Sequence, residues 1–244
     1  MPETHFDEWL AQRYETLWPE LFDPAVLNPT VDFLADLAGT GPALELGVGT
    51  GRIALPLSRR GIRVHGIELS PAMVTRLQAE VGGSEIGVTI GDFATAEVAE
   101  RFTLVYISCA TRSRTLRRKT SRSPASATPP RIWSPAARSS SRTTFPSCNA
   151  SPPGSPMRVF TATPTHIGIE EYDVAAQIAV SRHFWVIDGQ LKTFSSPHRY
   201  VWAAELDLMA RFAGLELQAR WGGWNHEPFT SESRHHISVW RKGA

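Results

Sequence analysis

Short apolar runs of strand length alternate with amphipathic segments over the first hundred residues of the chain. These runs predict four buried strands, at residues 44–46, 62–67, 86–90 and 102–108. After the second strand, Ser70 and Pro71 fit the N-cap and the first position of a helix. The buried stripe of that helix is expected to contain Met73, Leu77 and Val81, which recur every four residues. This alternation predicts repeated βα units.

Two helices are expected before the first strand. The first lies within residues 5–22 and places four side chains close to one stripe, namely Phe6, Leu10, Tyr14 and Leu17. The second is expected to begin at Asn28-Pro29-Thr30 and to end at Gly39, because glycine commonly follows the last residue of a helix. Both would lead into the first strand.

From Met157 onward the pattern is rich in strands. Three segments are expected to form antiparallel strands, at residues 166–173, 175–187 and 190–202. Asp188-Gly189 fits a hairpin turn between the last two. A helix over residues 203–213 follows, with Gly214 at its end, and its expected inward residues are Leu206, Met209 and Ala213. The last two predicted strands are 215–224 and 235–242.

Residues 109–156 do not share this patterning. These 48 residues contain eight Arg, one Lys, eleven Ser and eight Pro, with no Asp or Glu, and they show neither a helical nor a strand period. The rest of the chain therefore holds 16 basic residues against 24 acidic ones, a net charge of −8, although the whole chain has a formal charge of +1. Both cysteines, Cys109 and Cys148, lie in this segment.

Three interpretations of residues 109–156 remain open. One is a stretch translated in the wrong reading frame of a GC-rich gene, because one shifted frame of GC-rich codons for residues 132–156 gives an apolar strand and an amphipathic run. Another is a natural, disordered, Ser/Pro-rich basic insertion. The third is a long loop, which this length inside a compact domain disfavours. The frame error is favoured, so these arginines are not interpreted as a nucleic-acid site.

Composition narrows the class of protein. With 42% hydrophobic residues, eleven Phe and eight Trp, the chain is not wholly disordered. No run of 18 apolar residues predicts a membrane span, and the acidic N-terminus lacks the apolar region of a secretory signal. Two cysteines alone make neither a disulfide scaffold nor a zinc site. We expect a cytoplasmic protein with no membrane partner and no metal.

The segment PALELGVGTGRIALPL carries the clearest chemical signal. A strand ending at Leu46 leads into Gly47-x-Gly49-x-Gly51, and Glu45 lies two residues before the first glycine. Glycines allow positive φ and close approach of a ligand, and the following helix presents free N–H groups. The spacing differs from the dinucleotide fingerprint and from a P-loop, which requires a lysine.

The pattern Glu-x-Gly-x-Gly-x-Gly resembles motif I of class I S-adenosylmethionine-dependent methyltransferases. Glu68 at the end of the second strand, and Asp92-Phe93 after the third, match two further positions of the family. The resemblance implies that Glu68 accepts hydrogen bonds from the ribose hydroxyls, that Asp92 accepts one from the adenine amine, and that the Phe93 backbone meets the ring edge. The cofactor-binding residues expected for S-adenosyl-L-methionine, and for the product S-adenosyl-L-homocysteine, are Tyr14, Glu45, Gly47, Gly49, Gly51, Glu68, Leu69, Asp92 and Phe93.

The resemblance also implies a fold. The expected fold is α/β, a Rossmann-like sheet of seven mostly parallel strands with an antiparallel final strand, plus a small antiparallel β cap. The expected regions are the lead-in helices and cofactor-binding half at 1–108, the anomalous segment at 109–156, a cap over the acceptor site at 157–202, and the final helix and strands at 203–244. Thr103 stands where the family usually has an acidic residue.

The cap is expected to select the methyl acceptor. Arg199 would clamp an acidic substrate, and His198 or His166 would take a proton from an acceptor hydroxyl or amine. His183 and Tyr200 complete the predicted substrate site. For any single histidine a structural or surface role is the commoner one, and strand alternation turns half of these side chains away.

The function expected from the resemblance is direct methyl transfer to a nitrogen or oxygen atom of a small molecule, by a monomer or homodimer. Nucleic acid is disfavoured as a partner, because the Asn/Asp-Pro-Pro-Tyr/Phe motif of base methylation is missing. The alternative is an inactive cofactor-binding or misfolded product, since the loss of a central strand within 109–156 would leave backbone groups unpaired. A nucleic-acid modifier that uses the arginines of that segment would instead show steeply salt-dependent binding.

Overall fold

The structure is a computed structural model of the chain, and it describes residues 6–108, 133–144, 157–233 and 235–243. The chain divides into two compact units. Among the described residues, the first unit contains 6–108, 133–143, 203–233 and 235–243, and the second contains 144 and 157–202.

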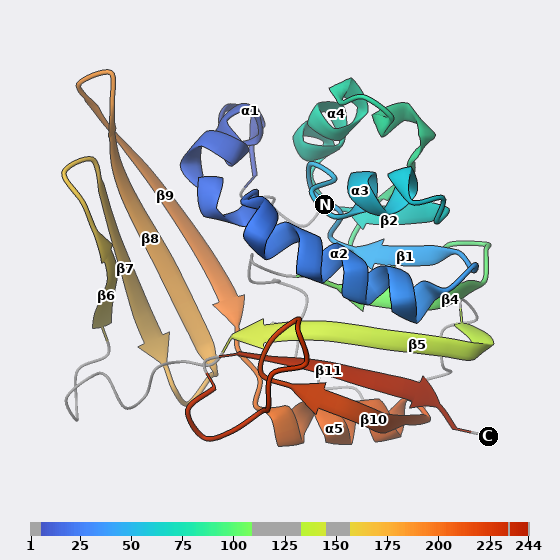
Figure 1. Cartoon of the computed structure of the whole chain (residues 1–244). Coiled ribbons are helices and arrows are strands. Elements are labelled where there is room, and N and C mark those ends of the chain that lie inside the picture. The colour runs from blue at the N-terminus through green and yellow to red at the C-terminus, as the bar shows by residue number, and fades with distance from the viewer. Residues whose placement is uncertain (1–5, 109–132, 145–156, 234, 244) are drawn as a thin grey trace. The chain divides into compact units, whose positions relative to one another are not determined.

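The first unit begins with two helices and then alternates strands with helices up to residue 90 (Figure 1). Its helices are α1 (Glu8–Leu17), α2 (Pro24–Ala38), α3 (Ala54–Arg59), α4 (Pro71–Ala79) and α5 (Ala203–Phe212), with short 3₁₀ helices at Pro19–Leu21 and Gly83–Glu85. Its strands are β1 (Ala43–Leu46), β2 (Val64–Glu68), β3 (Gly87–Ile90), β4 (Phe102–Ile107), β5 (Trp133–Thr144), β10 (Leu215–Trp221) and β11 (His235–Lys242). In the part of the chain described above, every helix is too short or too polar to cross a membrane.

The strands of the first unit lie side by side in the order β3-β2-β1-β4-β5-β11-β10. β1 is parallel to both of its neighbours, β2 and β4, and β3 is parallel to β2. β10 and β11 run antiparallel to each other. The prediction of an α/β fold with a parallel sheet and separate antiparallel strands is confirmed. Because parallel strands end at the same edge, the turns after β1, β2 and β3 all lie at that edge.

Strand β5 corrects the expectation for residues 109–156. The sequence of that segment shows no strand period, yet residues 133–144 pair in parallel with β4. Main-chain hydrogen bonding requires no alternation of side chains, and an unpaired edge of β4 would leave backbone groups without partners. The remaining residues of the segment, 109–132 and 145–156, lie outside the described part of the chain.

Helix α2 begins earlier than its sequence suggested. The Asp23 side chain accepts a hydrogen bond from the Ala25 N–H at 2.8 Å, and Pro24 occupies the first helical position. Asp23-Pro24 and Asn28-Pro29 are equivalent start signals, because aspartate and asparagine cap helices about equally well, and the helix begins at the earlier pair. Pro29 therefore lies inside the helix, which ends at Gly39 as expected.

Three side chains expected in the core are exposed, namely Val81, Met209 and Ala213. α4 ends at Ala79, so Val81 lies beyond it and is 84% exposed. On α5, Met209 is exposed, whereas Ala210 is buried. The rotation of α5 is fixed by Asp207, whose carboxylate binds the Arg220 guanidinium of β10 through two hydrogen bonds of 2.6 and 3.1 Å. With Asp207 facing β10, Ala210 follows on the same side of the helix.

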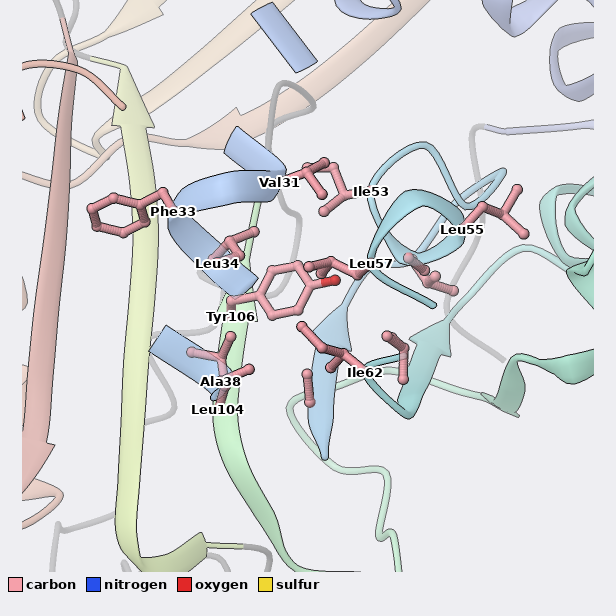
Figure 2. Packing of buried hydrophobic residues seen from close by; sticks show 14 of the residues in the cluster. Val31, Phe33, Leu34, Ala38, Ile53, Leu55, Leu57, Ile62, Leu104 and Tyr106 are labelled. Atoms are coloured by element: carbon pink, nitrogen blue, oxygen red, sulfur yellow. The ribbon is translucent and has the colours of Figure 1, made fainter. Parts of the chain in front are cut away.

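The core of the first unit packs α2 and α3 against the sheet (Figure 2). Val31 of α2 lies toward Ile53, and Leu34 lies toward Leu57 and the Tyr106 ring of β4. The same buried cluster extends to residues of β11 and of the loop before it. This packing holds α3 in place and so fixes the turn between β1 and α3.

The second unit is one antiparallel sheet. Its strands, paired in chain order, are β6 (Met157–Ala162), β7 (His166–Asp173), β8 (Ile178–Ile187) and β9 (Gln190–Arg199). Asp188 and Gly189 both have positive φ, 51° and 71°, so the predicted hairpin turn between β8 and β9 is confirmed. Along these strands buried and less buried residues alternate, which gives the sheet one buried face.

We expect Leu57→Ala to lower the free energy of unfolding by about 2–5 kcal/mol, because Leu57 is 0% exposed in the core of α3. The control is Leu208→Ala on α5, where leucine is 54% exposed and the loss should be within about 0.5 kcal/mol. Urea unfolding followed by circular dichroism measures both. Equal losses would contradict the placement of Leu57.

Candidate functional site

The turn after β1 is built from three glycines with left-handed backbone. Gly47, Gly49 and Gly51 have φ values of 78°, 57° and 82°. The Gly47 N–H donates to the Ile67 carbonyl at 2.8 Å, which ties the turn to β2. A Cβ at Gly51 would lie 2.2 Å from Leu77 Cδ1, whereas a Cβ at Gly47 would meet no atom of the described residues within 4 Å. The Gly47 backbone thus borders open space where a ligand can approach closely.

The Glu68 carboxylate joins this turn to the next one. One oxygen accepts a hydrogen bond from the Gly49 N–H and the other from the Ser70 N–H, both at 2.9 Å. Burial raises the pKa of the Glu68 carboxyl, although the hydrogen bonds from Ser70 and Gly49 oppose that rise. Each carboxylate oxygen has a second lone pair, so Glu68 can accept further hydrogen bonds from the hydroxyls of a ligand.

Glu45 lies in the core beside β4. Glu45 is 4% exposed, and one oxygen of its carboxyl group accepts a 2.9 Å hydrogen bond from the Tyr106 hydroxyl. Burial raises the pKa of Glu45 to about 8, although the Tyr106 hydrogen bond and the positive charge of Arg52 act in the opposite direction. Burial, together with the nearby Glu45 carboxylate, also raises the pKa of Tyr106. The Glu45 carboxyl is thus hydrogen-bonded within the protein, and contact of Glu45 with a cofactor stays a prediction.

Asp92 and Phe93 follow β3 at the same edge of the sheet. An Asp92 carboxylate oxygen accepts a hydrogen bond from the Ala94 N–H at 2.9 Å, which closes a local turn. The Phe93 side chain packs against the buried cluster of Leu44 and Ile67. The parallel order of β1, β2 and β3 therefore brings all three sequence-predicted turns to one edge.

The N-terminal helix is attached next to these turns. Tyr14 of α1 shares a buried cluster with Met73 of α4, and the Ser70 hydroxyl donates to the Phe6 carbonyl at 2.5 Å. Leu69, between Glu68 and Ser70 in the turn after β2, is half-buried. Tyr14 thus lies at the start of α4, near the turn after β2, while its expected contact with the methionine carboxylate stays a prediction.

Thr50 is a residue that the sequence analysis did not single out. Its hydroxyl is buried and has no hydrogen-bond partner among the described residues. A buried polar group without a partner costs about 1–3 kcal/mol, which a polar ligand group at the turn would recover. The available signal was a polar side chain between Gly49 and Gly51.

The buried face of the second unit brings two predicted histidines together. His166 Nε2 lies 3.0 Å from His183 Nδ1, so one ring donates a hydrogen bond to the other. The two rings are stacked with centroids 5.2 Å apart, and Trp185 stacks on both of them. This arrangement holds both imidazoles in fixed orientations.

His198 belongs to a second polar group on that face. Its Nε2 lies 3.6 Å from Glu170 Oε1, and its Nδ1 lies 3.2 Å from the Ser196 carbonyl oxygen. Glu170 also accepts hydrogen bonds from the Ser181 hydroxyl at 3.1 Å and from the Tyr172 hydroxyl. Glu170 was not predicted as a site residue, because the sequence alone did not show which of the adjacent residues Glu170 and Glu171 would face inward.

Arg199 and Tyr200 lie on opposite faces of the sheet, because successive strand residues alternate. The Arg199 guanidinium donates to the Gln177 side-chain oxygen at 3.0 Å. The buried Tyr200 ring contacts the Tyr172 ring at 6.1 Å between centroids, which groups it with Glu170. The structure therefore separates Arg199 from the histidines with which it was predicted to act.

Comparison with known proteins identifies the family. The sequence profile of a methyltransferase domain matches residues 43–122, which include all three turns. The CcbJ methyltransferase from Streptomyces caelestis is 29% identical, and the two structures align over 88% of this chain and 89% of that chain with a TM-score of 0.74. The chain is a class I S-adenosylmethionine-dependent methyltransferase. S-adenosyl-L-methionine is accordingly its cofactor.

Two more distant structures share the fold of this methyltransferase. An S-adenosylmethionine-dependent methyltransferase from Clostridium acetobutylicum is 11% identical, with a TM-score of 0.73 over 96% of this chain and 99% of that chain. The glycopeptide N-methyltransferase MtfA, complexed with S-adenosyl-L-methionine, is 15% identical, with a TM-score of 0.59 over 90% of this chain and 88% of that chain. No match was found among curated protein sequences.

The raised pKa of Glu45 predicts that the methyltransferase loses stability as the pH rises. The folded state keeps the Glu45 proton up to a pKa of about 8, whereas in the unfolded chain the carboxyl releases it near its usual pKa of 4.5. The stabilisation is therefore complete below the unfolded pKa and is lost as the pH rises through the folded pKa. Glu45→Gln removes this titration and keeps an oxygen that can accept from the Tyr106 hydroxyl.

We expect Glu45→Gln to be more stable than wild type at high pH by about 1–3 kcal/mol, and to lack this part of the pH dependence. Urea unfolding at a series of pH values measures the difference. The control is Glu97→Gln, because that side chain is exposed. Parallel stability curves for wild type and Glu45→Gln would contradict the prediction.

Glu68→Gln should loosen the turn after β1. A glutamine oxygen can accept from only one of the Gly49 and Ser70 N–H groups in this arrangement, because the amide nitrogen is a donor. We expect a loss of about 1–3 kcal/mol in unfolding free energy and faster hydrogen exchange at the backbone amide that loses its acceptor. Glu80→Gln, at the i,i+4 pair with Arg76, is the control. Unchanged exchange at both the Gly49 and the Ser70 amide would show that Glu68 does not hold the turn.

Proposed function

We propose that the chain transfers the methyl group of S-adenosyl-L-methionine to a nitrogen or oxygen atom of a small molecule. The observation that carries this proposal is the turn after β1, where Gly47 borders open space, Thr50 has a buried hydroxyl, and Glu68 retains acceptor capacity. A nucleoside with free ribose hydroxyls suits these groups. A phosphate group placed directly against the Glu68 carboxylate would be repelled by its charge, so these groups suit a ribose at that position.

In this proposal the residues of the three turns hold the cofactor. Glu68 accepts hydrogen bonds from the ribose hydroxyls, Asp92 accepts one from the adenine amine, and Tyr14 covers the methionine carboxylate. The remaining proposed cofactor residues are Glu45, Gly47, Gly49, Gly51, Leu69 and Phe93. When bound, S-adenosyl-L-methionine supplies an electrophilic methyl group, and the electron pair of the broken C–S bond stays on sulfur.

We further propose that the second unit recognises the acceptor. His198 or His166 takes the proton that the acceptor loses, and His183 and Tyr200 bind the acceptor, whereas Arg199 lies on the opposite face of the sheet and takes no part in this step. The support for this role is a buried sheet face that carries histidine, glutamate, serine and tyrosine side chains instead of an apolar surface. MtfA is described as a glycopeptide N-methyltransferase, which is compatible with a nitrogen acceptor here.

The alternative of an inactive or misfolded product is disfavoured. That alternative depended on the loss of the strand after β4, and β5 pairs with β4 there. We propose that β5, β11 and β10 complete a seven-stranded methyltransferase sheet. A monomer or homodimer in the cytoplasm, with a small molecule and not nucleic acid as its partner, is also part of this proposal.

The proposal is tested by isothermal titration with S-adenosyl-L-homocysteine. We expect wild type to bind, and Gly47→Ala to bind at least about tenfold more weakly, because a Cβ would enter the space beside the turn. Gly61→Ala is a matched control, since Gly61 has nearly the same φ, 81° against 78°, and also meets no described atom within 4 Å. Both variants therefore carry the same backbone strain. Absence of binding to folded wild type would refute the proposal, and equal affinities in the two variants would place the cofactor elsewhere.

A further inference from the structure

A buried carboxylate of the second unit is not used by the function proposed above. Glu170 of β7 lies opposite Ser181 of β8, and its side chain is 8% exposed. The Ser181 hydroxyl donates to one of its oxygens at 3.1 Å, and the Tyr172 hydroxyl donates to the other. Burying an acidic side chain is costly unless it is hydrogen-bonded or paired with a charge. These contacts suggest that Glu170 has a role besides packing.

A main-chain carbonyl fixes the orientation of the neighbouring imidazole. His198 Nδ1 lies 3.2 Å from the carbonyl oxygen of Ser196, which can only accept a hydrogen bond, so Nδ1 carries a hydrogen. In the neutral ring Nε2 then holds the lone pair. Nε2 lies 3.6 Å from Glu170 Oε1. The nitrogen of His198 that can accept a proton is therefore the one that faces the carboxylate.

A proton that reaches Nε2 turns this contact into an ion pair. The attraction between opposite charges at this separation is stronger in a buried site than in water. We propose that Glu170 is a positioning residue, which acts on His198 by stabilising its protonated ring after Nε2 takes the proton of the methyl acceptor. The inference rests on the proposed function, in which His198 removes that proton. In this step the bonding pair of the acceptor N–H or O–H group stays on the acceptor atom, and the proton ends on Nε2.

Other titratable groups share this sheet face with His198. His166 and His183 are hydrogen-bonded to each other at 3.0 Å, and Tyr172 donates to Glu170. The Tyr200 ring contacts the Tyr172 ring. In the described part of the chain, Glu170 is the acidic residue at ion-pair distance from His198. A change in the titration of His198 on removal of this one charge therefore tests the proposal.

The experiment is an NMR pH titration of the imidazole resonances of the full chain, with His198 assigned from a His198→Gln sample. In Glu170→Gln, we expect the titration midpoint of His198 to fall by about one pH unit or more relative to wild type. The matched control is Glu171→Gln. Glu171 is the adjacent residue, faces the other side of the strand, and pairs with Arg182 at 2.8 Å, so the midpoint should not change.

A second measurement needs no variant. Nitrogen-15 shifts of wild-type His198 above its midpoint should show the neutral tautomer with hydrogen on Nδ1. Hydrogen on Nε2 in that state, or an equal midpoint in Glu170→Gln and wild type, would overturn the proposal even if one of the variants does not fold. Titration of the same samples with S-adenosyl-L-homocysteine distinguishes a failure of the Glu170 proposal from a failure of the methyl-transfer proposal. Binding with an unchanged His198 midpoint refutes the role of Glu170 alone, whereas no binding with a shifted midpoint refutes the methyl-transfer proposal and leaves only an ion pair between Glu170 and His198.

Discussion

Two hydrogen bonds from backbone N–H groups to the Glu68 carboxylate hold together the part of the molecule on which the rest of the site depends. They join the glycine turn after β1 to the start of α4, since the donors are Gly49 and Ser70. The parallel pairing of β1 with β2 brings these two turns within reach of one side chain. A carboxylate bound in this way keeps lone pairs for ligand hydroxyls, so a single residue shapes the turn and is available to a ligand.

Burial acts differently on the two glutamates of the motif region. Glu68 is half-buried and accepts backbone hydrogen bonds that oppose the rise of its pKa. Glu45 is buried in the core, where a hydrogen bond from Tyr106 does not offset desolvation, and its pKa rises to about 8. The first carboxylate is therefore suited to accept hydrogen bonds from a ligand. The second keeps its proton near neutral pH and behaves as part of the core.

In the second unit, too, buried polar side chains are held by hydrogen bonds and ion pairs, here on one face of a sheet. Its buried face carries Glu170, Ser181, His183 and His198, each with a hydrogen-bond or ion-pair partner on a neighbouring strand or on its own strand. Register decides these partners, because Glu170 lies opposite Ser181. A shift of one residue would turn Glu171 inward instead and would move the whole polar set to the other face.

The sequence by itself determined the elements and the motif. Glycine spacing, the Ser70-Pro71 cap and the Asp188-Gly189 turn depend on local backbone chemistry, and the structure contains each of them. Only the tertiary structure decided the rest. β5 pairs with β4 without a strand period in its sequence, and Asp207, through its bond to Arg220, sets which side of α5 is buried. The His198–Glu170 contact likewise joins residues 28 positions apart. Local patterns contain no record of such partners, because strand pairing and the burial of polar groups depend on which segments meet in space.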